Sequence, residues 1–200
     1  LSAPALGWVC YAASWVAILT LMPPFLPEDS RDLIAGLMPL AGIASSMTLG
    51  VWLLRRLSAV SVIQIGFALC CLASLAVWAA PAHGWSYLAL ALALGLIQGA
   101  SFTAIPQLNP TPEAQAQANG ALAQMGNVGT TCGTPVLAAM MATGGIGGFL
   151  LFALTLYLCG ILLHLALARR RRRVARAPAT AGFWQQRADR LGRDWPLRAA

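Results

Sequence analysis

The chain has 200 residues, of which 58% are hydrophobic and only 10% are charged, and its formal net charge is +7. A soluble domain carries about 25% charged residues, whereas between positions 33 and 168 the ionic side chains, histidines aside, are Arg55, Arg56 and Glu113. This pattern excludes an ordinary water-soluble domain, whose surface needs ionic residues throughout, and indicates that lipid surrounds most of the chain.

Long apolar stretches follow one another along the chain. A bilayer core about 30 Å thick is crossed by roughly 20 apolar residues in a helix. Because backbone groups in hydrocarbon need partners within their own segment, each stretch is predicted to be a helix. The sequence therefore predicts an all-α membrane protein, with a six-transmembrane-helix bundle over residues 1–168. The predicted spans, in chain order, are residues 6–25, 33–54, 60–80, 85–105, 118–142 and 146–168.

The arginines predict how these helices are oriented. With six spans, the turn at Arg55 and Arg56 and a later run of arginines fall on the same side of the membrane, which the positive-inside rule makes cytoplasmic. We therefore expect a multi-pass protein of the cell inner (plasma) membrane with a cytoplasmic C-terminus. Four tryptophans lie near predicted membrane edges, where indole rings favour the interface: Trp8, Trp52, Trp78 and Trp85.

Residues 169–200 are predicted to form a basic cytoplasmic tail. It begins with the run Arg169, Arg170, Arg171, Arg172 and Arg173. Because the run directly follows an apolar helix, its predicted partner is anionic lipid headgroups and not nucleic acid. Further along, apolar residues recur at helical spacing between arginines: Trp184, Ala188, Leu191 and Trp195. Two interpretations stay open, an interfacial amphipathic helix and a disordered tail.

The fifth stretch is the most polar and the richest in glycine. Gln124, Asn127 and Thr131 can line a polar path, because uncharged polar groups are costly against lipid. Small residues near one face let a neighbouring backbone approach closely, and here they are Gly126, Gly129 and Gly133. Pro135 removes one backbone hydrogen bond and favours a kink. The helix either lines a cavity and moves during function, or packs tightly in the bundle with amides that only bridge helices.

The third and fourth stretches add weaker candidates. Gly95 and Gly99 have the small-xxx-small spacing of a helix contact, and Gln98 between them is a candidate cavity group. Gln64 is another candidate, although a lone amide also pairs readily with a neighbouring helix. No phosphate-binding loop with lysine, dinucleotide fingerprint or metal-spaced set of histidines and cysteines occurs. We therefore expect no cofactor and no metal.

Three features resemble the C-terminal half of the major facilitator superfamily. The segment that holds Gly50, Arg55 and Arg56 resembles the second copy of that family's cytoplasmic glycine–arginine loop motif, with Leu54 where the fuller pattern has an acidic residue. The glycine-rich fifth stretch, with Gln124, Asn127, Gly133 and Pro135, is similar to the family's eleventh helix. The basic end after the sixth stretch also fits, so the resemblance covers about residues 5–175.

The resemblance implies half of a twelve-helix secondary transporter fold. Such carriers have two six-helix halves related by pseudo-symmetry, with the substrate between them near the midplane. On this interpretation the chain, which starts at Leu1 and not at Met, is a fragment whose partner is an N-terminal six-helix half. The implied function is transport of a small molecule by alternating access. Uptake and efflux both stay open, and the protein is not expected to be an enzyme.

Two other functions remain as alternatives. The chain can be a membrane assembly subunit that transports nothing itself. A rhomboid-like intramembrane serine protease would use Ser101 with His164 as its base, since a serine nucleophile needs a base within hydrogen-bonding reach. In this chain Phe102 stands where the rhomboid serine motif has a glycine.

Overall fold

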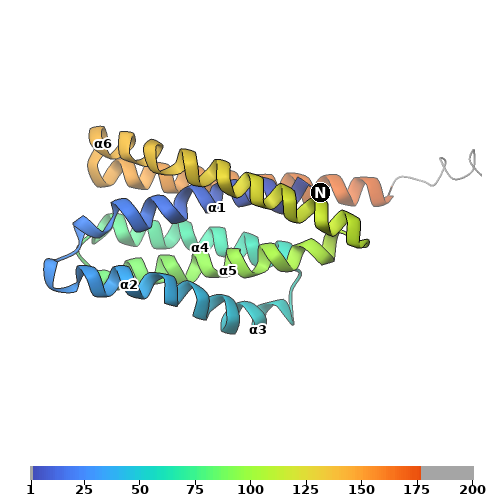
Figure 1. Ribbon diagram of the computed structural model, residues 1–200, viewed down its shortest axis with the longest axis horizontal. Coiled ribbons are helices and arrows are strands. Elements are labelled where there is room, and N and C mark those ends of the chain that lie inside the picture. The colour runs from blue at the N-terminus through green and yellow to red at the C-terminus, as the bar shows by residue number, and fades with distance from the viewer. Residues whose placement is uncertain (1, 177–200) are drawn as a thin grey trace, which may run out of the picture. The chain divides into compact units, whose positions relative to one another are not determined.

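The computed structural model describes residues 2–176, and every regular element in this part of the chain is helical (Figure 1). The elements are α1 (Ser2–Leu21), the 3₁₀ turn η1 (Pro23–Phe25), α2 (Glu28–Ser45), the π-helical turn η2 (Ser46–Gly50), α3 (Val51–Leu54), α4 (Ala59–Ala79), α5 (Gly84–Leu108) and α6 (Pro112–Arg176).

Within residues 2–176, five helical segments are long and apolar enough to cross a membrane. They are Pro4–Leu21, Glu28–Leu54, Ala59–Ala79, Gly84–Leu108 and Pro112–Arg173. The prediction of an all-helical fold is confirmed for residues 2–176, and several of their helices are long and apolar enough to cross a membrane. The predicted number of six separate helices is not found, because the expected fifth and sixth spans belong to one helix, α6, of 65 residues.

The helix α6 begins earlier than the sequence predicts and is interrupted once. It begins with Pro112 and Glu113. Proline at the first helical position loses no hydrogen bond, and the helix dipole stabilises an acidic side chain in the first turn. The interruption is at Gly145, which has φ 54° and ψ −135°. A positive φ of this kind is open mainly to glycine, because a Cβ would clash with the backbone. Pro135, in contrast, keeps helical backbone angles.

The interruption at Gly145 folds α6 back on itself. Gly126 in its first half lies against Trp8, and His164 in its second half lies against Gly7. An uninterrupted helix would separate positions 126 and 164 by about 57 Å, so both can reach one turn of α1 only if the two halves run antiparallel. Figure 1 shows this return, from the yellow half to the orange half.

Glycines form the contact between α1 and the first half of α6. A Cβ added at Gly129 would lie 2.7 Å from the carbonyl oxygen of Val9, and one added at Gly133 would overlap the backbone of Ala13. Since real Cβ atoms do not approach so closely, only glycine allows this spacing of the two helices.

A second close contact joins α2 to α5. Gly95 lies against the backbone of Gly42, and Gly99 lies against the side chain of Ser46. At this contact the helix changes into the π-helical turn η2, which begins at Ser46, and Thr48 Oγ1 donates a hydrogen bond of 2.6 Å to the Ala44 carbonyl. Such π-helical turns are rare and occur often at functional sites.

The segment expected to be a cytoplasmic loop after the second span is partly helical. Gly50 is buried as the last residue of η2, and α3 continues the helix to Leu54. An apolar run keeps its hydrogen bonds internal until its end, which explains why the turn starts only at Arg55. Arg55 and Arg56 are exposed in that turn, and the Arg56 guanidinium carbon lies 6.0 Å from the ring of Trp52.

The chain divides into two compact units, Leu1–Leu165 and Ala166–Ala200. In the first, α5 packs against α4 and α2, and large buried side chains such as Phe67, Tyr87 and Tyr157 fill the interior. The described part of the second unit is the end of α6, where Arg169, Arg170, Arg172 and Arg173 are exposed. The tail beyond position 176, including the proposed amphipathic helix, lies outside the described residues.

Candidate functional site

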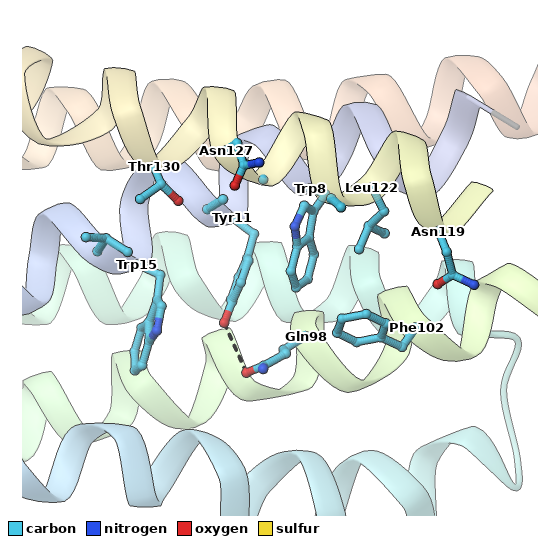
Figure 2. Close-up of a pocket in the computed structure, with 13 residues that line it drawn as sticks. Trp8, Tyr11, Trp15, Gln98, Phe102, Asn119, Leu122, Asn127 and Thr130 are labelled. Carbon is cyan, nitrogen blue, oxygen red and sulfur yellow. Dashed lines mark hydrogen bonds between the residues drawn. The ribbon is translucent and has the colours of Figure 1, made fainter. Parts of the chain in front are cut away.

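Helix α1 places three aromatic side chains on one face. Trp8, Tyr11 and Trp15 follow one another at spacings of three and four residues, which bring side chains to the same side of a helix. The rings of Trp8 and Tyr11 stack with centroids 4.4 Å apart. The rings of Tyr11 and Trp15 are nearly parallel, at 13°, with centroids 6.5 Å apart. Together they form a row of aromatic rings along α1 (Figure 2).

Helix α5 supplies the facing wall through Gln98 and Phe102, one helical turn apart. The Tyr11 hydroxyl donates a hydrogen bond of 3.0 Å to Gln98 Oε1. The ring of Phe102 meets Trp8 edge-on, with centroids 5.3 Å apart. This arrangement holds the two aromatic side chains of α1 in place and leaves the Gln98 amide nitrogen as a donor.

The first half of α6 forms the third side. Gly126 lets Trp8 lie close to the helix, since an added Cβ would come 2.8 Å from the indole nitrogen. Asn119, Asn127 and Thr130 line the same space. Asn119 Nδ2 donates to the Gln115 carbonyl at 3.1 Å, which leaves its amide oxygen available as an acceptor.

These three helices line a widely open cavity of about 550 Å³. Among the described residues, this lining holds aromatic rings, amides, aliphatic side chains and small residues, and no acidic or basic side chain. Such a site can bind a ligand by stacking and hydrogen bonding. The lining residues are Trp8, Tyr11, Ala12, Trp15, Val16, Gln98, Phe102, Asn119, Leu122, Ala123, Gly126, Asn127 and Thr130.

The residues predicted from sequence as cavity groups are found in three places. Gln98 and Asn127 both line the cavity, from α5 and α6. Gln124 and Thr131 lie on α6 but outside the lining, and both are exposed. Gln64 is partly buried in α4 and is not part of the lining. The structure thus brings together one predicted residue from each of two distant spans.

Sequence reasoning missed the aromatic row of α1. The sequence pattern places Trp8 near a membrane edge, and the structure adds that its indole packs against Tyr11 and Phe102. The available signal was the spacing of Trp8, Tyr11 and Trp15 within one apolar stretch, which predicts a single aromatic face. That spacing alone does not reveal which helix the face meets.

Ser101 and His164 are both buried. Ser101 lies on α5, and the His164 ring lies beside Gly7 of α1 and 6.2 Å from the Phe67 ring of α4. Among residues 2–176, no group of three or more histidine, cysteine or acidic side chains is placed to hold a metal ion.

Comparison of the chain with protein-family models, with curated proteins and with solved structures returns no match.

Proposed function

We propose that this chain is the C-terminal half of a secondary transporter of the major facilitator type. It contributes one wall of the substrate cavity and works by alternating access. The observation that carries the proposal is the uncharged cavity of about 550 Å³ between three apolar helices, with Gln98 and Asn127 on facing walls. Polar groups inside a membrane bundle are costly against lipid and commonly mark a substrate path.

The exposed polar residues of α6 are an argument for a protein partner. Gln117, Gly120, Gln124, Asn127 and Thr131 recur at helical spacing and are all exposed. Amides turned toward lipid would lack hydrogen-bond partners, at a cost of several kcal/mol each, on the order of the hydrocarbon transfer values. A second six-helix half, which would close the open side of the cavity, gives these amides a polar or hydrated surface.

The reversal of α6 at Gly145 divides this helix into two halves, and the proposal counts each half as one membrane span. The two antiparallel halves of α6 would each cross the bilayer, and together with the four earlier segments they make six crossings. With six crossings, the turn at Arg55 and Arg56 would lie on the same side of the membrane as the arginine run. We place that side in the cytoplasm, where Arg169, Arg170, Arg172 and Arg173 would contact anionic headgroups.

Alternating access is tested by labelling from the two sides of the membrane. In a protein that contains both halves and has its native cysteines replaced, Asn127→Cys is treated with a membrane-impermeant maleimide on sealed vesicles of either orientation. A carrier exposes the cavity to both sides in turn, so labelling is expected from each. Labelling from one side only, with Arg56→Cys as the positive control for the cytoplasmic face, would favour a fixed assembly subunit.

A further inference from the structure

We infer that the cavity selects a flat aromatic ligand that carries a positive charge. This inference deepens the proposed function and rests on it in taking the cavity as the substrate site. It concerns binding alone, so it is measured without any flux.

The aromatic row of α1 provides the first argument. The faces of tryptophan and tyrosine rings are electron-rich, so they attract both a stacked aromatic ring and a cation within about 6 Å of the centroid. Trp8 and Tyr11 already stack closely on each other. The wider, nearly parallel pair of Tyr11 and Trp15, with centroids 6.5 Å apart, is therefore where we place the ligand ring.

The charge of the lining provides the second argument. None of the thirteen lining residues carries an ionic side chain, so an anionic ligand would lose its water shell and meet no positive partner. A cation in the same place gains the attraction of the aromatic rings. It therefore replaces lost hydration with a specific interaction, which becomes stronger as the site loses water.

The polar groups of the lining provide the third argument. The Asn119 amide oxygen is left over after its nitrogen bonds the Gln115 carbonyl. The Asn127 side chain makes no hydrogen bond with any residue between positions 2 and 176. Both amides line the cavity; in Figure 2 Asn127 lies near Tyr11, whereas Asn119 lies at the other end of the lining, beyond Leu122 and Phe102. They can accept hydrogen bonds from the N–H groups of a protonated amine.

Three acridines test the inference, because they share one tricyclic ring and differ in charge. At pH 7, 9-aminoacridine is a cation, acridine is neutral and acridine-9-carboxylate is an anion. Equilibrium dialysis against the purified chain in detergent is expected to give the tightest binding for 9-aminoacridine and the weakest for the carboxylate. Equal affinity for the cation and the neutral ring, or tighter binding of the anion, would overturn the inference.

Substitutions at Trp15 separate a site in the cavity from binding elsewhere. Trp15→Leu is expected to weaken 9-aminoacridine binding about tenfold, while Trp15→Phe, which keeps an aromatic face, restores most of it. The matched control is Trp85→Leu, since Trp85 is 81% exposed and lies outside the cavity lining. Weakening by Trp85→Leu to the same extent, or unchanged binding in Trp15→Leu, would place the ligand elsewhere.

The two proposals can fail separately. Binding in the expected order of charge, with labelling of Asn127→Cys from one side only, would keep the aromatic-cation site and reject transport. Labelling from both sides, with no preference among the acridines, would keep transport and reject the ligand class.

Discussion

Tyr11 and Gln98 are 87 positions apart in the chain, yet the hydroxyl of one donates a 3.0 Å hydrogen bond to the side-chain oxygen of the other. This bond joins α1 to α5 at the cavity wall. It fixes the middle ring of the aromatic row, because Tyr11 lies between Trp8 and Trp15.

Removing this bond is expected to weaken the bundle modestly. Tyr11→Phe should lower the free energy of unfolding by about 1 kcal/mol, the usual net value of such a bond in water and in membrane helix bundles. The measurement is a denaturation titration in mixed detergent micelles followed by circular dichroism. The control, Ser74→Ala, also loses a buried hydroxyl, but Ser74 Oγ has no hydrogen-bond partner among the described residues, so its stability should not fall. Equal losses in both variants would contradict a stabilising role for the bond.

The contact between α1 and α6 should tolerate no side chain at Gly133. Gly133→Ala forces its methyl group into the backbone of Ala13 and is expected to cost about 1–3 kcal/mol, as overpacking usually does. Gly120→Ala in the same helix is the matched control, since an added Cβ there meets nothing within 4 Å. That variant should be neutral or slightly more stable, because alanine favours a helix over glycine. The same unfolding titration compares the two, and a stable Gly133→Ala variant would show that the helices are farther apart.

The turn of α6 allows backbone strain to be tested at a position where an added side chain would meet no other atoms. Neither Gly144 nor Gly145 has an atom within 4 Å of an added Cβ, but only Gly145 has a positive φ. Gly145→Ala should therefore destabilise the protein by about 1–3 kcal/mol, whereas Gly144→Ala should not. If thermal unfolding in detergent gives the same midpoint for both variants, the α6 turn does not depend on the backbone angles of Gly145.

The orientation of the chain can be checked at two exposed turns. In a background without native cysteines, Arg56→Cys should react with an impermeant maleimide only from the cytoplasmic side, and His83→Cys only from the opposite side. Both positions are exposed, and α4 between them is long and apolar enough to cross the membrane. Reaction of both from one side would show that α4 does not cross.

The long apolar helices could be predicted because their signal is local. The predicted span 60–80 corresponds to α4, Ala59–Ala79, since apolar length and a following proline determine both the element and its end. The fourth span is longer than expected, because Pro106 lies inside α5 and did not end it. Proline is tolerated inside helices of membrane proteins, where neighbouring groups can satisfy the freed carbonyl.

The cavity depended on information that no single segment carries. Gln98 and Asn127 were predicted as cavity groups from their polarity alone, but their common cavity depends on the glycine contacts that set the distances between helices. The return of α6 required the backbone angles of Gly145, in a run that also holds Gly144, Gly147 and Gly148. A run of glycines predicts a turn without saying which of them takes the left-handed angle.

One turn of α1 contacts both halves of α6. Gly7 lies against His164 in the second half of α6, and Trp8 lies against Gly126 in the first half. Close contacts of this kind leave little free space between α1 and either half of α6. A widening of the cavity that kept these contacts would separate α1 from α5 and would break the hydrogen bond between Tyr11 and Gln98.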